Sequence, residues 1–187
     1  MLKKDLYSKL FAGVDESRHG LDNEVFTIVV SPLAKDAERY LISKNTRINS
    51  KDKDKILWIP LQERDYRYAL VNRSHYKKYG QHQLIKEITR ELVASIKPEY
   101  NEIELYIDGD LTSKQRGAIK REVAKVAYIK YPEIGVHSIA KRRNKENKFE
   151  TNYLLVTADS LANFLSRNYS PKELQEGEIS RNRVLFN

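Results

Sequence analysis

The stretch that most constrains this chain is an apolar run leading directly into two neighbouring carboxylates, at residues 10–16. The run ends at Asp15 and Glu16, and residues 17–20 then supply a hydroxyl, a cation, an imidazole and a glycine. A second apolar run follows at residues 25–30. We interpret the two runs as a hairpin with strands over residues 10–15 and 24–30. Acids at the end of a buried strand are costly unless a cation, commonly a metal ion, compensates them.

The rest of the chain alternates helix-like and strand-like segments. Apolar residues at helical spacing predict helices over about residues 81–97 and 152–167, and one that starts at Thr112 or Ser113 and is closed by Pro132. Strict alternation predicts a half-buried strand over residues 103–107 that runs into Asp108. We also expect strands at 56–59, 67–71 and 134–139, a short helix within 34–43, a basic loop at 141–148 and a short helix near 171–176.

This order of segments predicts the α/β class, a mixed sheet flanked by helices. With 187 residues, we expect a single domain over residues 1–187, with a polar lead at 1–9 and a polar tail at 169–187. Within the tail, residues 184–186 are apolar, and we expect them to pack back onto the body of the domain.

Composition points to a polyanionic partner and an intracellular setting. The formal charge is +8 and the pI is near 9.4. These values bear on binding and solubility and carry no information on the fold. The absence of cysteine excludes disulfides, thiolate zinc sites and a cysteine nucleophile, and it favours a reducing, cytoplasmic location. No run has the length of a signal peptide or a membrane span, so we expect no membrane partner.

Three acids far apart in the sequence stand at the end of, or inside, apolar elements. Asp15 and Asp108 close predicted strands, and Asp159 lies within a predicted helix, on the face that carries Asn152 and Asn163. A separate face of that helix is apolar and would pack on the core; it comprises Leu154, Ala158, Leu161 and Leu165. An unpaired ion in such a helix costs roughly several kcal/mol. Acids brought together from two strand ends and one helix would suit Mg²⁺ or Mn²⁺.

Each acid also has a simpler explanation. The Asp108-Gly109 pair is typical of a turn, and a hairpin loop needs no metal to use Asp15 and Glu16. Asp159 has possible arginine partners, Arg18 or Arg142. Neighbouring strand residues point to opposite faces, so Asp15 and Glu16 share a metal only if the strand ends or bulges between them. The combination of three acids is what favours a metal site.

The acidic motifs resemble those of a known family. Residues 14–20 read Val-Asp-Glu-Ser-Arg-His-Gly, similar to the Asp-Glu-x-Gly-Arg-Gly signature of ribonuclease HII and to the Asp-Glu-Ser-Gly opening of a broad group of ribonuclease H-like proteins. Residues 107–109, Ile-Asp-Gly, resemble the second acidic motif of both. Residues 158–162, Ala-Asp-Ser-Leu-Ala, resemble the Ala-Asp-x-x-Ala helix of the broader group. Together the motifs span about residues 10–167.

The resemblance implies a ribonuclease H-like mixed sheet flanked by helices and two-metal nuclease chemistry. It makes Asp15, Glu16, Asp108 and Asp159 the catalytic, metal-binding acids. Two ions about 4 Å apart are the usual device for in-line attack on a phosphodiester. The chain departs from ribonuclease HII at residues 18–20, where Arg-His-Gly replaces Gly-Arg-Gly, so a permissive glycine becomes a long cation. We therefore expect a diverged member of the family, and we do not predict specificity for a ribonucleotide junction.

Basic residues near the acids are candidates for binding nucleic acid. Arg18 and His19 follow the first two acids directly, and His19 has the chemistry to shuttle a proton. A basic segment precedes the helix of Asp159, and its cations could hold a phosphate backbone. They are Lys141, Arg142, Arg143, Lys145 and Lys148. The alternative for this segment is a solvated surface loop. We expect structural roles for His82 and His137.

Three functions remain open. The first is a Mg²⁺- or Mn²⁺-dependent nuclease, such as an endonuclease, that hydrolyses phosphodiester bonds in RNA, an RNA–DNA hybrid or structured DNA. The second is a non-catalytic nucleic-acid-binding protein on the same scaffold. The third is an interaction protein whose charge serves only solubility. Asp159 on the opposite side of the sheet from Asp15 and Asp108 would exclude the first.

Overall fold

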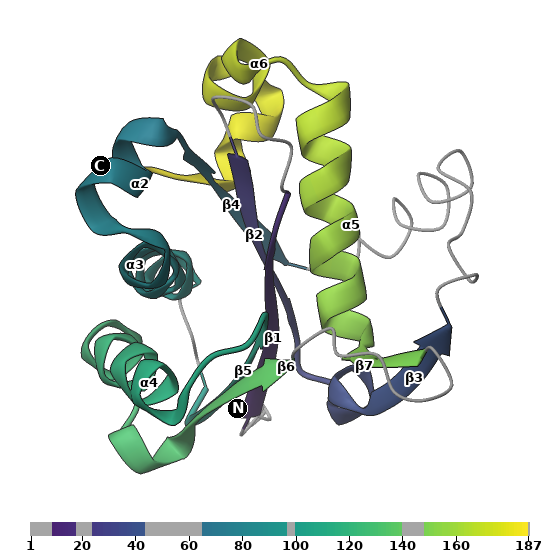
Figure 1. Ribbon diagram of the computed structural model, residues 1–187, viewed down its shortest axis with the longest axis vertical. Coiled ribbons are helices and arrows are strands. Elements are labelled where there is room, and N and C mark those ends of the chain that lie inside the picture. The colour runs from purple at the N-terminus through teal and green to yellow at the C-terminus, as the bar shows by residue number, and fades with distance from the viewer. Residues whose placement is uncertain (1–8, 18–23, 44–64, 97–99, 140–147, 187) are drawn as a thin grey trace, which may run out of the picture.

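The computed structural model shows a mixed six-stranded sheet with helices on both faces (Figure 1). The structure describes residues 9–17, 24–43, 65–96, 100–139 and 148–186. The sheet has the order β6-β5-β1-β2-β4-β8. Its strands are β1 (Lys9–Glu16), β2 (Glu24–Ser31), β4 (Tyr66–Val71), β5 (Glu102–Asp108), β6 (Ile134–Ile139) and β8 (Arg183–Val184). A separate pair joins β3 (Arg39–Ser43) to β7 (Lys148–Asn152).

The predicted hairpin forms the middle of the sheet. Strand β1 pairs antiparallel with β2 and parallel with β5, and β5 pairs parallel with β6. On the far side, β2 pairs antiparallel with β4, which pairs parallel with β8. The acidic ends of β1 and β5 are therefore the ends of neighbouring parallel strands.

Helices α3 and α4 cover one face of the sheet, and α5 covers the other (Figure 1). The helices are α2 (Arg73–Tyr79), α3 (Gln81–Ser95), α4 (Ser113–Ala127), α5 (Tyr153–Asn168) and α6 (Pro171–Glu176), with 3-10 turns η1 (Ala34–Ala37), η3 (Tyr131–Glu133) and η4 (Glu178–Asn182). Side-chain caps fix where several of them begin. Thr112 and Gln115 cap each other at the start of α4, and the Asn152 side chain accepts a hydrogen bond from the Leu155 N–H at the start of α5.

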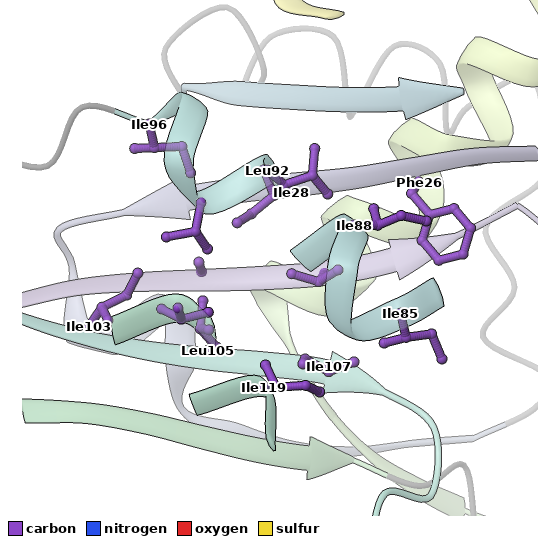
Figure 2. Close-up of a cluster of buried hydrophobic side chains, with 14 of the residues drawn as sticks. Phe26, Ile28, Ile85, Ile88, Leu92, Ile96, Ile103, Leu105, Ile107 and Ile119 are labelled. Carbon is purple, nitrogen blue, oxygen red and sulfur yellow. The ribbon is translucent and has the colours of Figure 1, made fainter. Parts of the chain in front are cut away.

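Alternation along the central strands divides the core in two. Side chains such as Ile28, Ile103 and Leu105 point toward α3 and α4 and pack with Ile88 and Leu92 (Figure 2). The alternate positions point toward α5. There Val25 and Val29 pack against the helical stripe predicted from sequence, namely Leu154, Ala158, Leu161 and Leu165. Every residue of that stripe is at most 1% exposed.

The structure corrects two sequence predictions. Residues 34–43, expected as a helix, form only the turn η1 before continuing as β3. Lys148, expected as the last residue of a basic loop over 141–148, is instead the first residue of β7, and residues 141–147 lie outside the described residues. Strands β3 and β7 pair with each other across more than a hundred residues of sequence, a contact that no local pattern reveals. The strand expected at 56–59 lies outside the described residues.

Both ends of the described chain are incorporated in the sheet. Lys9, placed in the polar lead, begins β1, and the tail contributes β8, with Val184 and Phe186 packed against the core as expected. Leu185, between them, is exposed. The division into a single domain with a lead and a tail stays a prediction. No helix in the described part of the chain has the length and apolar character needed to cross a membrane.

Helix α5 lies directly on β1 at Gly13. A Cβ atom at Gly13 would come within 2.5 Å of the Leu154 carbonyl carbon and 2.6 Å of its oxygen. Real Cβ atoms do not approach backbone so closely, so the absence of a side chain at Gly13 sets how near the helix can come. By contrast, a Cβ at Gly117 in α4 would meet nothing nearer than the Arg121 guanidinium, at 3.7 Å.

We therefore expect opposite effects from the same substitution at these two glycines. Gly13→Ala should lower the free energy of unfolding by about 1–3 kcal/mol, because α5 must move away from the sheet. Gly117→Ala should raise it by about 0.5–1 kcal/mol, because alanine is the better helix former. Urea denaturation monitored by circular dichroism measures both. Equal stability of the Gly13→Ala variant and the parent chain would contradict the contact.

Candidate active site

Asp15 and Asp108 lie next to each other at the ends of parallel strands. The register pairs Val14 of β1 with Ile107 of β5, and each aspartate is the next residue in its strand. Val14 and Ile107 both belong to the core beneath α3 and α4. Because successive side chains alternate, Asp15 and Asp108 both point to the opposite face, the one that α5 covers. Asp15 is 6% exposed, and Asp108 is half-buried.

Helix α5 brings Asp159 to the same level of the sheet. Leu154 lies over Gly13, and four residues later the Ala158 carbonyl accepts a hydrogen bond from Thr27 Oγ1 at 2.9 Å. Thr27 is the β2 partner of Asp15. Two residues of strand and four of helix are each about 6–7 Å long, so α5 and β1 stay in step over this distance. Asp159 follows Ala158 and therefore lies on the same side of the sheet as Asp15 and Asp108.

Asp159 lies at the margin of the helix's buried stripe, not within it. Its side chain is half-buried, and Asn163 Nδ2 donates to its Oδ1 at 3.1 Å and to its backbone oxygen at 2.8 Å. The pairing follows the i, i+4 spacing seen in the sequence. The arginines considered as partners, Arg18 and Arg142, lie outside the described residues.

Glu16 is directed away from the three aspartates. The β1–β2 register continues without a bulge through Glu16, which pairs with Phe26, and Phe26 belongs to the core beneath α3. The Glu16 N–H donates to Asp15 Oδ1 at 2.7 Å. Neither condition that would let Glu16 share a metal with Asp15, an ended strand or a bulge, is met in β1.

The loop after Asp108 is held by the neighbouring strand β6. Gly109 has φ of 115°, a conformation that favours glycine, and its N–H donates to the Ile139 carbonyl at 3.2 Å. Ser138 Oγ donates to the Gly109 carbonyl at 2.6 Å and accepts from the Leu111 N–H at 2.9 Å. The Asp-Gly turn expected from sequence is therefore present, and it fixes the position of Asp108.

A charged and aromatic cluster that sequence analysis did not identify lies beside Asp108. Tyr106 is two residues earlier on the same face of β5, and the His137 ring stacks on it with centroids 4.9 Å apart. His137 Nε2 is 2.6 Å from a Glu104 carboxylate oxygen, and Lys9 Nζ is 2.9 Å from the other. The alternation of residues 102–108 places Glu104 and Tyr106 with Asp108, but only the β5–β6 register reveals the partnership with His137.

This network shifts the pKa of Glu104 and the pKa of Lys9. Partial burial acts to raise the pKa of Glu104, but hydrogen bonds from His137 and Lys9 outweigh burial, and the pKa lies below its ordinary value. The pKa of Lys9 is raised, first by its hydrogen bond to Glu104 and then by that to Glu102. Glu104 is thus held as a carboxylate, with its charge compensated by the Lys9 ammonium.

The carboxylates of Asp15, Asp108 and Asp159 have the oxygen chemistry that Mg²⁺ and Mn²⁺ prefer. Within residues 9–17, 24–43, 65–96, 100–139 and 148–186, however, no group of three or more His, Asp or Glu side chains is arranged to hold a metal ion. The backbone therefore puts the three acids on one face, while the described side chains do not converge on one point.

Most of the predicted nucleic-acid-binding residues fall outside the described structure. Arg18, His19, Lys141, Arg142, Arg143 and Lys145 belong to this set. Lys148 is the first residue of β7, where it pairs with Ser43. The position of these cations relative to the three aspartates stays a prediction.

Solved structures with the same arrangement of strands and helices are ribonucleases HII and HIII. A chain in the PCNA–RNase HII complex from Archaeoglobus fulgidus matches with a TM-score of 0.56 and 16% identity, over 93% of this chain and 81% of that one. Bst-RNase HIII in complex with Mn²⁺ matches with a TM-score of 0.53 and 16% identity, over 86% of this chain and 53% of its own. The fold is ribonuclease H-like.

This ribonuclease H-like fold was predicted from the three acidic motifs and is confirmed. A point mutant of Bst-RNase HIII matches with a TM-score of 0.51 and 16% identity, over 84% of this chain and 52% of that chain. The present chain thus spans about half the length of the ribonuclease HIII chains. No family model and no curated protein matches the sequence. At 16% identity the likeness shows the fold and not the activity.

The hydrogen bond from Thr27 to Ala158 should be a measurable part of the attachment of α5. Thr27→Val keeps the side-chain volume but removes the donor, and should cost about 1 kcal/mol of unfolding free energy. Amide hydrogen exchange in α5 should accelerate, because the lost bond joins the helix to the sheet. Thr157→Val is the matched control, since Thr157 Oγ1 donates within α5, to the Tyr153 carbonyl at 2.7 Å. Equal effects of the two substitutions would contradict this role.

Proposed function

We propose that this chain is a divalent-metal-dependent nuclease acting on RNA, an RNA–DNA hybrid or structured DNA. The observation that carries the proposal is the placement of Asp15, Asp108 and Asp159 on one face of a ribonuclease H-like sheet, at one level of β1. Asp159 on the other face would have excluded a shared site. The charge of +8 supports a polyanionic substrate.

In this proposal each aspartate has a defined part. Asp15 and Asp108, fixed by neighbouring strands, would hold a divalent cation from the sheet, and Asp159 would complete the site from α5. Asn163 would orient Asp159 through its hydrogen bond to Oδ1. A bound pair of Mg²⁺ or Mn²⁺ ions would activate water and stabilise the leaving oxygen. Arg18, His19 and the cations of residues 141–148 would contact the phosphate backbone.

Replacing single acids tests the proposal. Asp15→Asn, Asp108→Asn and Asp159→Asn should each lower Mg²⁺- or Mn²⁺-dependent cleavage by about a hundredfold or more, because each removes a ligand charge worth several kcal/mol to the transition state. Glu16→Gln should lower cleavage less than any of them, because β1 directs Glu16 to the other face. Labelled RNA, hybrid, junction and duplex DNA substrates, analysed on denaturing gels, give the rates and the preferred substrate.

Asp65→Asn is the matched control for these variants, because Asp65 is exposed at the start of β4 and pairs with Arg67. It should retain the cleavage rate of the parent chain. Thermal unfolding of each variant separates loss of a ligand from loss of the fold. Cleavage that persists in EDTA, or in all three asparagine variants, would contradict the metal mechanism.

The alternative is a non-catalytic nucleic-acid-binding protein on the same scaffold. It is favoured by the side-chain arrangement, since the described residues include no group of three or more ligands placed to hold a metal. Salt-dependent binding of the same substrates, with no cleavage in either Mg²⁺ or Mn²⁺, would establish this alternative.

A further inference from the structure

A second group of residues with the chemistry of nucleic-acid binding lies at the far end of α4. Helix α4 starts just after the Asp108 loop and runs for 15 residues, so its other end lies about 22 Å along the helix axis. It also packs on the face of the sheet opposite to α5 (Figure 1). Whatever binds there is distinct from the site of the three aspartates.

Tyr128 is the most unusual residue at this end. It is 96% exposed, so its ring makes almost no contact with the protein. It also ends α4 in the left-handed conformation, with φ of 56°, and no other non-glycine residue in the described part of the chain has a positive φ. This position favours glycine, so a tyrosine here strains the backbone. Its exposed ring makes no packing contacts that would offset this strain.

A second tyrosine and three lysines lie within eight residues of Tyr128 in the chain. Tyr131 is 45% exposed, and the Lys120 ammonium lies 4.6 Å from its ring centroid. Lys130, between the tyrosines, is exposed, and Lys125 lies one turn earlier in α4. Lys125 pairs with Glu122 at 2.8 Å, whereas Lys120 and Lys130 have no carboxylate ion pair within the described residues.

We propose that Tyr128, Tyr131, Lys120 and Lys130 form an accessory site for single-stranded nucleic acid. Exposed aromatic faces stack on unpaired bases without regard to sequence, and adjacent lysines hold the phosphate backbone. The charge of +8 makes a polyanion the fitting partner. A protein partner fits less well, because lysines and not apolar side chains accompany the tyrosines.

The inference depends on the proposed function only for the class of partner. The accessory site would hold an unpaired stretch of a substrate at a distance from the aspartates. Binding measured in EDTA excludes metal-dependent cleavage, so a failure of the nuclease proposal and a failure of this one give different results. A fluorescein-labelled oligothymidylate of about eight nucleotides is a suitable probe, since it falls within typical site sizes.

Tyr128→Gly separates binding from folding. We expect the affinity for the oligothymidylate, measured by fluorescence anisotropy, to fall about fivefold or more, the effect of losing one base stack. The melting temperature should stay the same or rise, because glycine relieves the backbone strain. A merely structural Tyr128 would give the reverse, a lower melting temperature with unchanged affinity, and that result would overturn the proposal.

Lys130→Ala tests the charged part of the same site. Its affinity for the probe should fall, and the slope of log K against log salt should decrease by about one unit or slightly less. Lys172→Ala, an exposed lysine of α6, is the matched control and should bind as the parent chain does. Affinities of Tyr128→Gly and Lys130→Ala equal to that of the parent chain would overturn the proposal and leave a protein partner as the explanation of the exposed tyrosines.

Discussion

The close contact between α5 and β1 is the constraint on which the candidate site depends. Gly13 lets the Leu154 backbone lie directly on the strand, and Thr27 holds the Ala158 carbonyl four residues later. One contact sets the distance between α5 and the sheet at a single point, and a second contact further along α5 also sets the direction of the helix across the sheet. Together they set the position of the Asp159 backbone along the sheet relative to Asp15. The relative position of the three aspartates is thus set by the contacts between α5 and the sheet, and it does not require the carboxylates to attract a cation first.

The two faces of the sheet differ in a way that locates the site. Beneath α3 and α4 most of the alternating positions from β5 across to β4 are apolar, with charged residues such as Glu16 only at the strand ends. On the other face α5 lies over β1 and β2, where most side chains are apolar, whereas β5 presents Glu104, Tyr106 and Asp108. The three aspartates therefore stand at the border between the covered and the polar part of that face. A ligand could reach them from β5 and β6 without displacing α5.

Local sequence patterns predicted those parts of the molecule that depend on one element at a time. Alternation over residues 103–107 gave β5 and the face of Asp108, and helical spacing gave the buried stripe of α5. Features that depend on pairing between distant segments were missed. Strands β3 and β7 are examples, as are the contacts of His137 with Tyr106 and Glu104, which the β5–β6 register brings together. Glu16 shows the same limit, since its direction follows from an unbroken register with β2.

The energetic reason for expecting a cation, which the sequence suggested for both Asp15 and Asp159, applies in the structure to Asp15. From the sequence, Asp159 was expected to need a compensating partner, because it is a charged residue inside an apolar helix. In the structure it is half-buried and accepts a hydrogen bond from Asn163, so its charge keeps access to water and costs little. Of the three aspartates, Asp15, at 6% exposure, is the one whose solvation the fold reduces most. A divalent cation would therefore gain its strongest electrostatic interaction from Asp15, where the local dielectric is low, while Asp159 could adjust its side chain to complete the coordination. The rigid ligands would come from the strands and the adaptable one from the helix.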